Sequence, residues 1–565
     1  MNGLTMLMGS FAVLLAAYFI YGRFLERKWG TDEQARTPAH EFNDGVDYVP
    51  ARRSVVFGHE FASIAGAGPI NGPIIAAMFG WMPALIWILV GGIFFGAVQD
   101  FAALYASVKN KGRTIGYIIE LYIGKTGKRL FLLFVWLFSI LVIAAFADIV
   151  AGTFDGFGSN AAQNEANAAV ASTSILFMLA AVGLGFYLFH RQPGGGTSAL
   201  VAIVLLTACI AAGLTCPLYM SKGFWLHFVF AYIFVASITP VWALLQPRDY
   251  LNSFLLVALI AGAFIGIVVS NPTMHIVPFA GFTVNDQQLF PILFVTIACG
   301  AVSGFHSLVA SGTASKQVDN ERDMLPISFG AMLLESLLAV ISLVAVGALA
   351  VGGVLPSGTP PVVFATAVAG FLAAIGIPQH MTYTVITLAV AAFALTSLDS
   401  VARVGRLAFQ EVFSDSQADT VPMGPLRRFC ANRYLATAVT LLMGYLLSLR
   451  GYMDIWPLFG SANQLLAALS LIACAVFLKK TNRAGAMLYL PMVSMLAITF
   501  TALGLTIDKL LGKMSVDGAF QVASDGIQLL FAVLLLALGI LVAAAGIGKL
   551  RGKPEGGRTV AVDPA

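Results

Sequence analysis

The sequence predicts an all-α protein that crosses a membrane many times, and three observations carry this prediction. Hydrophobic residues make up 59% of the 565 residues and charged residues only 11%, whereas soluble domains carry about a quarter charged residues. The mean hydropathy of +0.87 describes the whole chain and leaves little room for a separate soluble domain. Apolar runs near the ~20 residues that a spanning helix needs recur along the chain. We therefore expect one transmembrane domain over 1–565.

We expect about 15 spanning helices, each corresponding to one apolar run. The runs are 4–22, 56–80, 83–108, 130–151, 171–190, 197–216, 224–245, 251–270, 289–312, 326–354, 380–407, 430–449, 455–478, 485–507 and 524–547. The first run lacks a basic segment before it and a small-residue cleavage site after it, so we interpret it as a retained helix.

Lysine and arginine in the loops predict the orientation, because basic loops remain on the cytoplasmic side. With the N-terminus outside and the C-terminus inside, all 32 basic residues except Lys222, Arg450, Lys509 and Lys513 fall inside. The short run 360–377, bracketed by prolines, would reverse this bias around Arg403 and Arg406 if it crossed. We expect it to be a re-entrant or interfacial segment on the outer side.

The second apolar run is interrupted in its middle by Gly66, Gly68, Pro69, Gly72 and Pro73. Proline removes a backbone donor and glycine weakens the helix that remains. Irregular backbone at membrane depth is tolerated where it lines a cavity or is buried in protein. We therefore expect a broken helix whose free backbone groups contact a solute.

The ninth run has the same character over 299–313, with Gly300, Gly304 and Gly312 among several polar side chains. The predicted topology runs the second span outward and the ninth span inward, so the two are inverted. Each is followed by a helix with one acid, Asp100 and Glu335. This pattern is typical of inverted-repeat transporters; close helix packing through small residues is the alternative.

The inverted pair divides the chain into segments of predicted role. We expect a first helix and cytoplasmic loop over 1–53, repeat one over 54–216, an inserted helix pair over 217–288, repeat two over 289–478, and two C-terminal helices with a short tail over 479–565. The repeats correspond to the second to sixth and the ninth to thirteenth spans. The predicted substrate contacts are Gly66, Ala67, Gly68, Pro69, Asn71, Gly72, Ser303, Gly304, Phe305, His306, Ser307, Ser311 and Thr313.

Ion or proton coupling is predicted at polar residues near these breaks. The eleventh run ends in a group of oxygen-bearing side chains that suit a hard cation such as Na⁺: Thr396, Ser397, Asp399 and Ser400. Arg403 follows Asp399 at i+4, so an ion pair along the helix is the alternative for Asp399. His59, Glu60 and Asp100 are further candidates, against a membrane-surface position for His59 and Glu60 and a helix-locking hydrogen bond for Asp100.

Three other ionisable residues lie in or near the apolar runs. His306 lies on the second broken run and titrates near neutral pH, so substrate or proton contact and a structural role are both open. Lys316 either binds an anion or faces the cytoplasm, and Asp148 is expected to be solvated at the outer end of the fourth span.

Several functions lack their motifs. Gly194–Gly196 follows Pro193 but is not followed by the lysine of a phosphate-binding loop, and no HExxH motif is present. The five cysteines have no metal-binding spacing, so we expect them to pack as free thiols. We predict no enzyme activity, cofactor, metal or nucleic-acid partner; the oligomeric state is open.

Six longer motifs stand out along the chain, at 41–50, 57–62, 66–73, 246–252, 304–317 and 458–466, which read EFNDGVDYVP, FGHEFA, GAGPINGP, QPRDYLN, GFHSLVASGTASKQ and LFGSANQLL. Through these motifs the chain resembles the carbon starvation protein A family. Together they cover most of 41–470. One departure is Glu60, where some family members carry a second histidine, which weakens any proton mechanism based on a histidine pair.

The resemblance implies a bacterial inner-membrane transporter tied to carbon starvation that imports peptides or pyruvate, with a proton as the expected coupling ion. It also implies the amino acid–polyamine–organocation superfamily and its LeuT-like five-plus-five inverted repeat. In that architecture the third helix of repeat two supplies hydroxyls to a cation site, here Thr396 and Ser397. We expect a proton- or cation-coupled symporter; the alternatives are an uncoupled facilitator and a solute-binding nutrient sensor.

Overall fold

The computed structural model consists almost entirely of helices, and it describes 2–45, 47–158, 161–191, 194–240, 244–413, 429–514, 520–521 and 525–551. Within these residues the one small sheet is a hairpin of β1 (Thr283–Val284) and β2 (Gln287–Gln288), paired antiparallel. All-helical architecture is the expected solution in a bilayer, because a helix satisfies its own backbone hydrogen bonds.

The described residues up to Ser270 form thirteen α-helices. They are α1 (Gly3–Ala16), α2 (Arg23–Trp29), α3 (Pro38–Glu41), α4 (Arg53–Ile64), α5 (Gly68–Ala76), α6 (Trp81–Gly91), α7 (Ala97–Lys109), α8 (Ile115–Tyr122), α9 (Lys125–Thr153), α10 (Ala161–Arg191), α11 (Gly195–Thr215), α12 (Lys222–Ile238) and α13 (Leu245–Ser270). Side-chain oxygens of Thr114 and Ser221 cap the starts of α8 and α12.

The second half follows the same pattern. Its helices are α14 (Leu289–Thr296), α15 (Gly304–Gly312), α16 (Ala331–Leu349), α17 (Pro360–Ala373), α18 (Gln379–Phe413), α20 (Arg433–Ser448), α21 (Tyr452–Lys480), α22 (Ala486–Met514) and α23 (Asp525–Arg551). Two π-helical turns, Gly92–Gly96 and Leu325–Gly330, lead directly into α7 and α16.

Eleven helices in the described residues are long and apolar enough to cross a membrane, or up to twelve when the bent pair α4–α5 is counted as one span. Each predicted run coincides with one of these helices or with a shorter element: α12, α20, or the pair α14 and α15. The protein is therefore a multi-pass helical membrane protein, while the count of about 15 spans remains a prediction.

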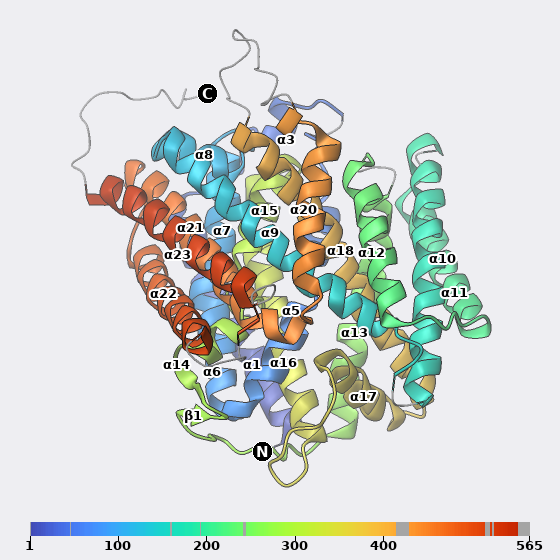
Figure 1. The fold of residues 1–565 in the computed structure, drawn as a ribbon. Helices are drawn as coiled ribbons and strands as arrows, with labels where there is room; N and C mark the ends of the chain where they lie inside the picture. The colour runs from blue at the N-terminus through green and yellow to red at the C-terminus, as the bar shows by residue number, and fades with distance from the viewer. Residues whose placement is uncertain are drawn as a thin grey trace.

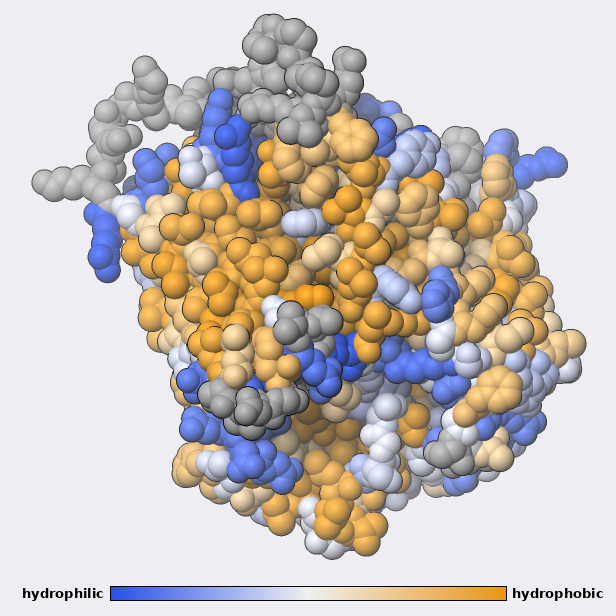
Figure 2. Space-filling model, in the orientation of Figure 1, coloured by the Kyte–Doolittle hydropathy of each residue, from blue (hydrophilic) through white to orange (hydrophobic). Residues whose placement is uncertain are grey.

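The core lies along α9, α18 and α21, whose apolar windows are 83%, 89% and 100% buried, whereas α11 lies at the periphery with 28% buried. Figure 1 shows α3 and α8 at one end of the molecule and the N-terminus, β1 and α17 at the other. Figure 2 shows a broad hydrophobic zone across this face, with hydrophilic residues above and below it. The loops around α3 and α8 and the segment α17 therefore lie at opposite ends of the molecule, and their orientation in the membrane remains a prediction.

Candidate functional site

The first break is shorter than the motif that predicted it. α4 ends at Ile64, α5 begins at Gly68, and the two axes bend by 44° across the three residues between them. Gly72 and Pro73 lie inside α5 and not in the break. The interruption thus falls on Ala65, Gly66 and Ala67, which are buried.

The second break covers 297–303, between α14 and α15. Of the predicted contacts, Ser303 lies in the break, and Gly304, Phe305, His306, Ser307 and Ser311 lie on α15. Asn463 of α21 holds the first residues of α15. Its Oδ1 accepts from the Phe305 backbone N–H and the Ser303 hydroxyl at 3.2 Å each, and so caps α15.

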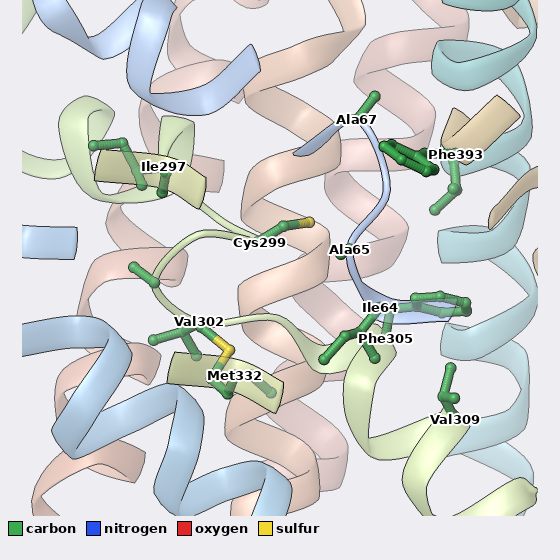
Figure 3. Close-up of a cluster of buried hydrophobic side chains, with 14 of the residues drawn as sticks. Ile64, Ala65, Ala67, Ile297, Cys299, Val302, Phe305, Val309, Met332 and Phe393 are labelled. Carbon is green, nitrogen blue, oxygen red and sulfur yellow. The ribbon is translucent and has the colours of Figure 1, made fainter. Parts of the chain in front are cut away.

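The two breaks lie against each other, as Figure 3 shows for Ala65 and Ala67 on one side and Cys299 and Val302 on the other. A Cβ built on Gly68 would lie 2.5 Å from the Cβ and Sγ of Cys299, and one on Gly72 would lie 2.7 Å from the Thr296 carbonyl oxygen. Only glycine allows this approach of two backbones. The two broken runs, far apart in sequence, therefore meet inside the protein.

His306 stands at the centre of a buried group of acids, which we call the His306 cluster (Glu60, Asp100, His306 and Glu335). Its Nδ1 lies 2.9 Å from Asp100 Oδ2 and its Nε2 lies 3.2 Å from Glu335 Oε2. All four side chains are buried, and α4, which carries Glu60, packs against α15 and α16. The cluster joins α4, α7, α15 and α16.

Several polar atoms beside the breaks have no hydrogen-bond partner among the described residues. Both carboxylate oxygens of Glu60, both polar side-chain atoms of Asn71 and the Gln99 Oε1 are of this kind. Gln99 uses its amide to donate to the Ser303 carbonyl oxygen at 2.8 Å. Buried polar atoms are nearly always paired, so these are available to a ligand.

The hydroxyls of α18 lie beside the first break. A Cβ on Gly66 would lie 2.5 Å from Ser397 Oγ, and this hydroxyl has no other partner among the described residues. Thr396 Oγ1 donates to the Ala392 carbonyl oxygen at 3.0 Å and accepts from the Asn252 amide. Ser400 is partly exposed, whereas Thr396, Ser397 and Asp399 are buried.

The alternative pairing of Asp399 with Arg403 is wrong. Asp399 pairs with Arg248 of α13 and accepts a hydrogen bond from the Tyr232 hydroxyl of α12 at 2.9 Å. Arg403 instead donates to the Ala236 and Thr239 carbonyl oxygens at the end of α12. The i+4 spacing allows a pair, but tertiary packing supplied a nearer cation.

The remaining candidates lie apart from the breaks or serve the helices. His59 Nδ1 lies 3.8 Å from Asp249 Oδ2, and 22% of the His59 side chain is exposed. Ser311 and Thr313 donate to carbonyl oxygens one turn earlier, and Ser307 shares a 2.7 Å hydrogen bond with Ser470. Lys316 lies over the Tyr48 ring.

The expectation that Asp148 is solvated is wrong. Only 4% of Asp148 is exposed. Its oxygens lie 2.7 Å from the Lys222 ammonium and accept the Tyr452 N–H at 2.9 Å. Its position near a span end suggested water, but α12 and α21 cover it.

The prediction named Glu335 only as a mark of symmetry, and it omitted Tyr232, Arg248, Asp249 and Asn463 from the site. A signal existed, because Arg248, Asp249 and Asn252 belong to the 246–252 motif and Asn463 to the 458–466 motif. Lone polar residues in an apolar run are the pointer to function in membranes. Nothing in the spacing indicated which of them meet.

Comparison with known proteins gives the family. The carbon starvation protein CstA family matches residues 2–356 and 353–502. The chain belongs to this family. Two relatives from Escherichia coli strain K12 are each 32% identical over 93% of this chain and 84% of their own length: the "Peptide transporter CstA" and the "Pyruvate/proton symporter BtsT". The "Peptide transporter CstA" of Bacillus subtilis strain 168 is 33% identical over 85% of this chain and 86% of its own.

Two solved structures show a more distant likeness. The Eremococcus coleocola manganese transporter, in complex with an aromatic bis-isothiourea substituted compound, matches 90% of this chain and 98% of its own with a TM-score of 0.47 at 12% identity. MhsT in complex with L-phenylalanine matches 88% and 99% with a TM-score of 0.44 at 15% identity. The printed names of the relatives are those of transporters.

Proposed function

We propose that this chain is an inner-membrane symporter that imports a small organic acid or peptide together with a proton. The observation that carries the proposal is the contact between the two breaks, bordered by the unpartnered polar atoms of Asn71, Glu60 and Gln99. Discontinuous helices that meet inside a membrane protein form solute sites in transporters. The printed names of the relatives, a peptide transporter and a pyruvate/proton symporter, support the same class of substrate.

The proposed repeats 54–216 and 289–478 contribute corresponding elements to this site. In each, a broken helix is followed by a π-helical turn and then by an acid of the His306 cluster, Asp100 in α7 and Glu335 in α16. We place the N-terminus outside and the C-terminus inside, with α17 as an outer interfacial segment. Alternating access would then move one repeat against the other around the breaks.

The His306 cluster is the proposed proton site. It holds three carboxyl groups around one imidazole, so complete ionisation would leave more negative than positive charge in a buried place. Each uncompensated buried ion costs several kcal/mol, so the occluded cluster favours bound protons, and access of water from one side allows their release.

A sodium site on α18 receives less support. Thr396 Oγ1 already accepts from Asn252, and Asp399 is paired with Arg248. Ser397 alone retains a free hydroxyl among the described α18 candidates with buried oxygens. Na⁺ needs several oxygen ligands at once, and of the buried side-chain oxygens of these candidates only Ser397 Oγ and Asp399 Oδ1 lack a hydrogen-bond partner among the described residues.

Uptake of labelled pyruvate and of a labelled dipeptide into proteoliposomes tests the proposal. A proton gradient directed into the vesicles, with the acidic side outside, should drive accumulation of at least one of them, and a Na⁺ gradient alone should not. His306→Gln should abolish accumulation, whereas His227→Gln, on the exposed face of α12, should preserve it. Uptake that is unaffected by collapse of both gradients would contradict a symporter.

A further inference from the structure

Arg248 is a buried cation at the start of α13, outside both breaks. Its side chain is 2% exposed and it is held on one side only. The Nη1 donates both to Asp399 of α18 and to the Tyr232 hydroxyl, which itself donates to Asp399. A charged group in a membrane span is costly and usually marks a functional position.

The other edge of this guanidinium is unused. Nε and Nη2 are both buried and donate to no atom of the described residues. These two N–H groups lie in the guanidinium plane along one edge and form the fork that a carboxylate accepts through two parallel hydrogen bonds. Buried donors without a partner cost free energy, and a ligand carboxylate would supply the missing acceptors.

The surroundings of Arg248 connect it to the first break. Asn252, one turn along α13, donates to Thr396 of α18. The next residue, Ser397, contacts Gly66 and keeps a free hydroxyl. Asp249, the residue after Arg248 on α13, lies 3.8 Å from His59, whose side chain is 22% exposed.

We propose that the Nε and Nη2 of Arg248 bind the carboxylate of the transported solute, which makes the substrate class monocarboxylates. Pyruvate and a peptide C-terminus both present this group. The assignment rests on the proposed function for its role in transport, and it places the body of the solute along Ser397 and Gly66.

A carboxylate bound at Arg248 changes the net charge of this buried site. Asp399 already balances Arg248, so a bound carboxylate adds one negative charge to a buried site. The titratable and charged groups that face this position are His59 on α4, Tyr232 on α12, Asp249 on α13, and Asp399 and Arg403 on α18. A proton on one of the acids or on His59 restores neutrality, so the solute carboxylate and a proton should bind together.

Binding to the purified full-length protein in detergent tests the assignment, with each acid compared to its neutral analogue: pyruvate against methyl pyruvate, and alanylalanine against its C-terminal amide. The wild type should bind at least one acid roughly 10- to 100-fold more tightly than its analogue, which is the value of hydrogen bonds to a charged group. Which acid shows the preference distinguishes the two sources of the carboxylate.

Arg248→Lys retains the charge but removes the fork, and it should lose most of this preference. Because a partly unfolded variant would mislead, Arg248→Gln combined with Asp399→Asn removes both charges together and should bind acid and analogue alike. Arg322→Lys is the matched control and should keep the preference, since the Arg322 side chain is 61% exposed and lies beside Glu33.

A full acid preference in either Arg248 variant overturns the assignment, and so does a wild type that binds neither acid or does not distinguish acid from analogue. Accumulation in proteoliposomes separates this result from the proposed function. Acid-selective binding without gradient-driven accumulation refutes symport and leaves the role of Arg248 intact. Accumulation with unchanged acid preference in Arg248→Lys refutes the assignment alone.

Discussion

Gly68→Ala perturbs the contact between the two breaks by a single methyl group. The added Cβ would lie 2.5 Å from the Cβ and Sγ of Cys299, so the two segments would have to separate by about 1 Å to restore ordinary contact. Overpacking of this kind costs about 1–3 kcal/mol. A shift of about 1 Å at a binding site can reduce activity ~100-fold, so we expect uptake to fall far more than the amount of folded protein.

A double variant that adds the methyl group at position 68 and removes the side chain at position 299 provides the test. Cys299→Gly removes the opposing side chain, so the double variant Gly68→Ala with Cys299→Gly should recover much of the uptake and of the thermal stability in detergent. Gly312→Ala, with nothing within 4 Å of the added Cβ, is the control and should behave as the wild type. Wild-type uptake and melting by Gly68→Ala, or no recovery in the double variant, would refute the contact between the breaks.

Two further changes test the packing around the site by thermal unfolding. Asn463→Ala leaves the Phe305 N–H and the Ser303 hydroxyl without their acceptor, so it should lower the free energy of unfolding by about 1–3 kcal/mol. The control Thr501→Ala, on the exposed face of α22, should change it by no more than ~0.5 kcal/mol. Equal melting temperatures of the two variants would contradict the capping role. Asp148→Ala should lower the melting temperature more than Lys222→Met. Lys222 is 45% exposed, so water screens its ion pair with Asp148, whereas Asp148 also accepts the Tyr452 N–H. The reverse order would show that the ion pair dominates.

The sequence predicted the helices well because a spanning segment must be apolar and long, whatever packs around it. Each predicted run, from 4–22 to 524–547, has a helical counterpart in the described residues. It also located both interruptions, since glycine and proline act on their own backbone. The limits of the breaks were less accurate: Pro69 lies in the first turn of α5, where proline is tolerated, and α5 continues through Pro73 inside the helix.

Side-chain partners were harder to predict than helices. Asp399 could pair with Arg403 along one helix, and only the packing of α13 against α18 brings Arg248 nearer. Asp148 lies near a span end, yet two other helices cover it. Sequence spacing describes neighbours on one helix, whereas ion pairs in a bundle depend on which faces of different helices meet.

The amino-acid sequence by itself determined that this chain spans a membrane many times, that two of its helices break, and that acids follow the breaks. These properties are local, because they depend on the hydropathy and backbone freedom of consecutive residues. The tertiary structure decided that the breaks touch through Gly68 and Cys299, that Asp100 and Glu335 face the same His306, and that Arg248 keeps one edge free. Such contacts join residues separated by long stretches of chain, and their geometry exists only once the helices have packed.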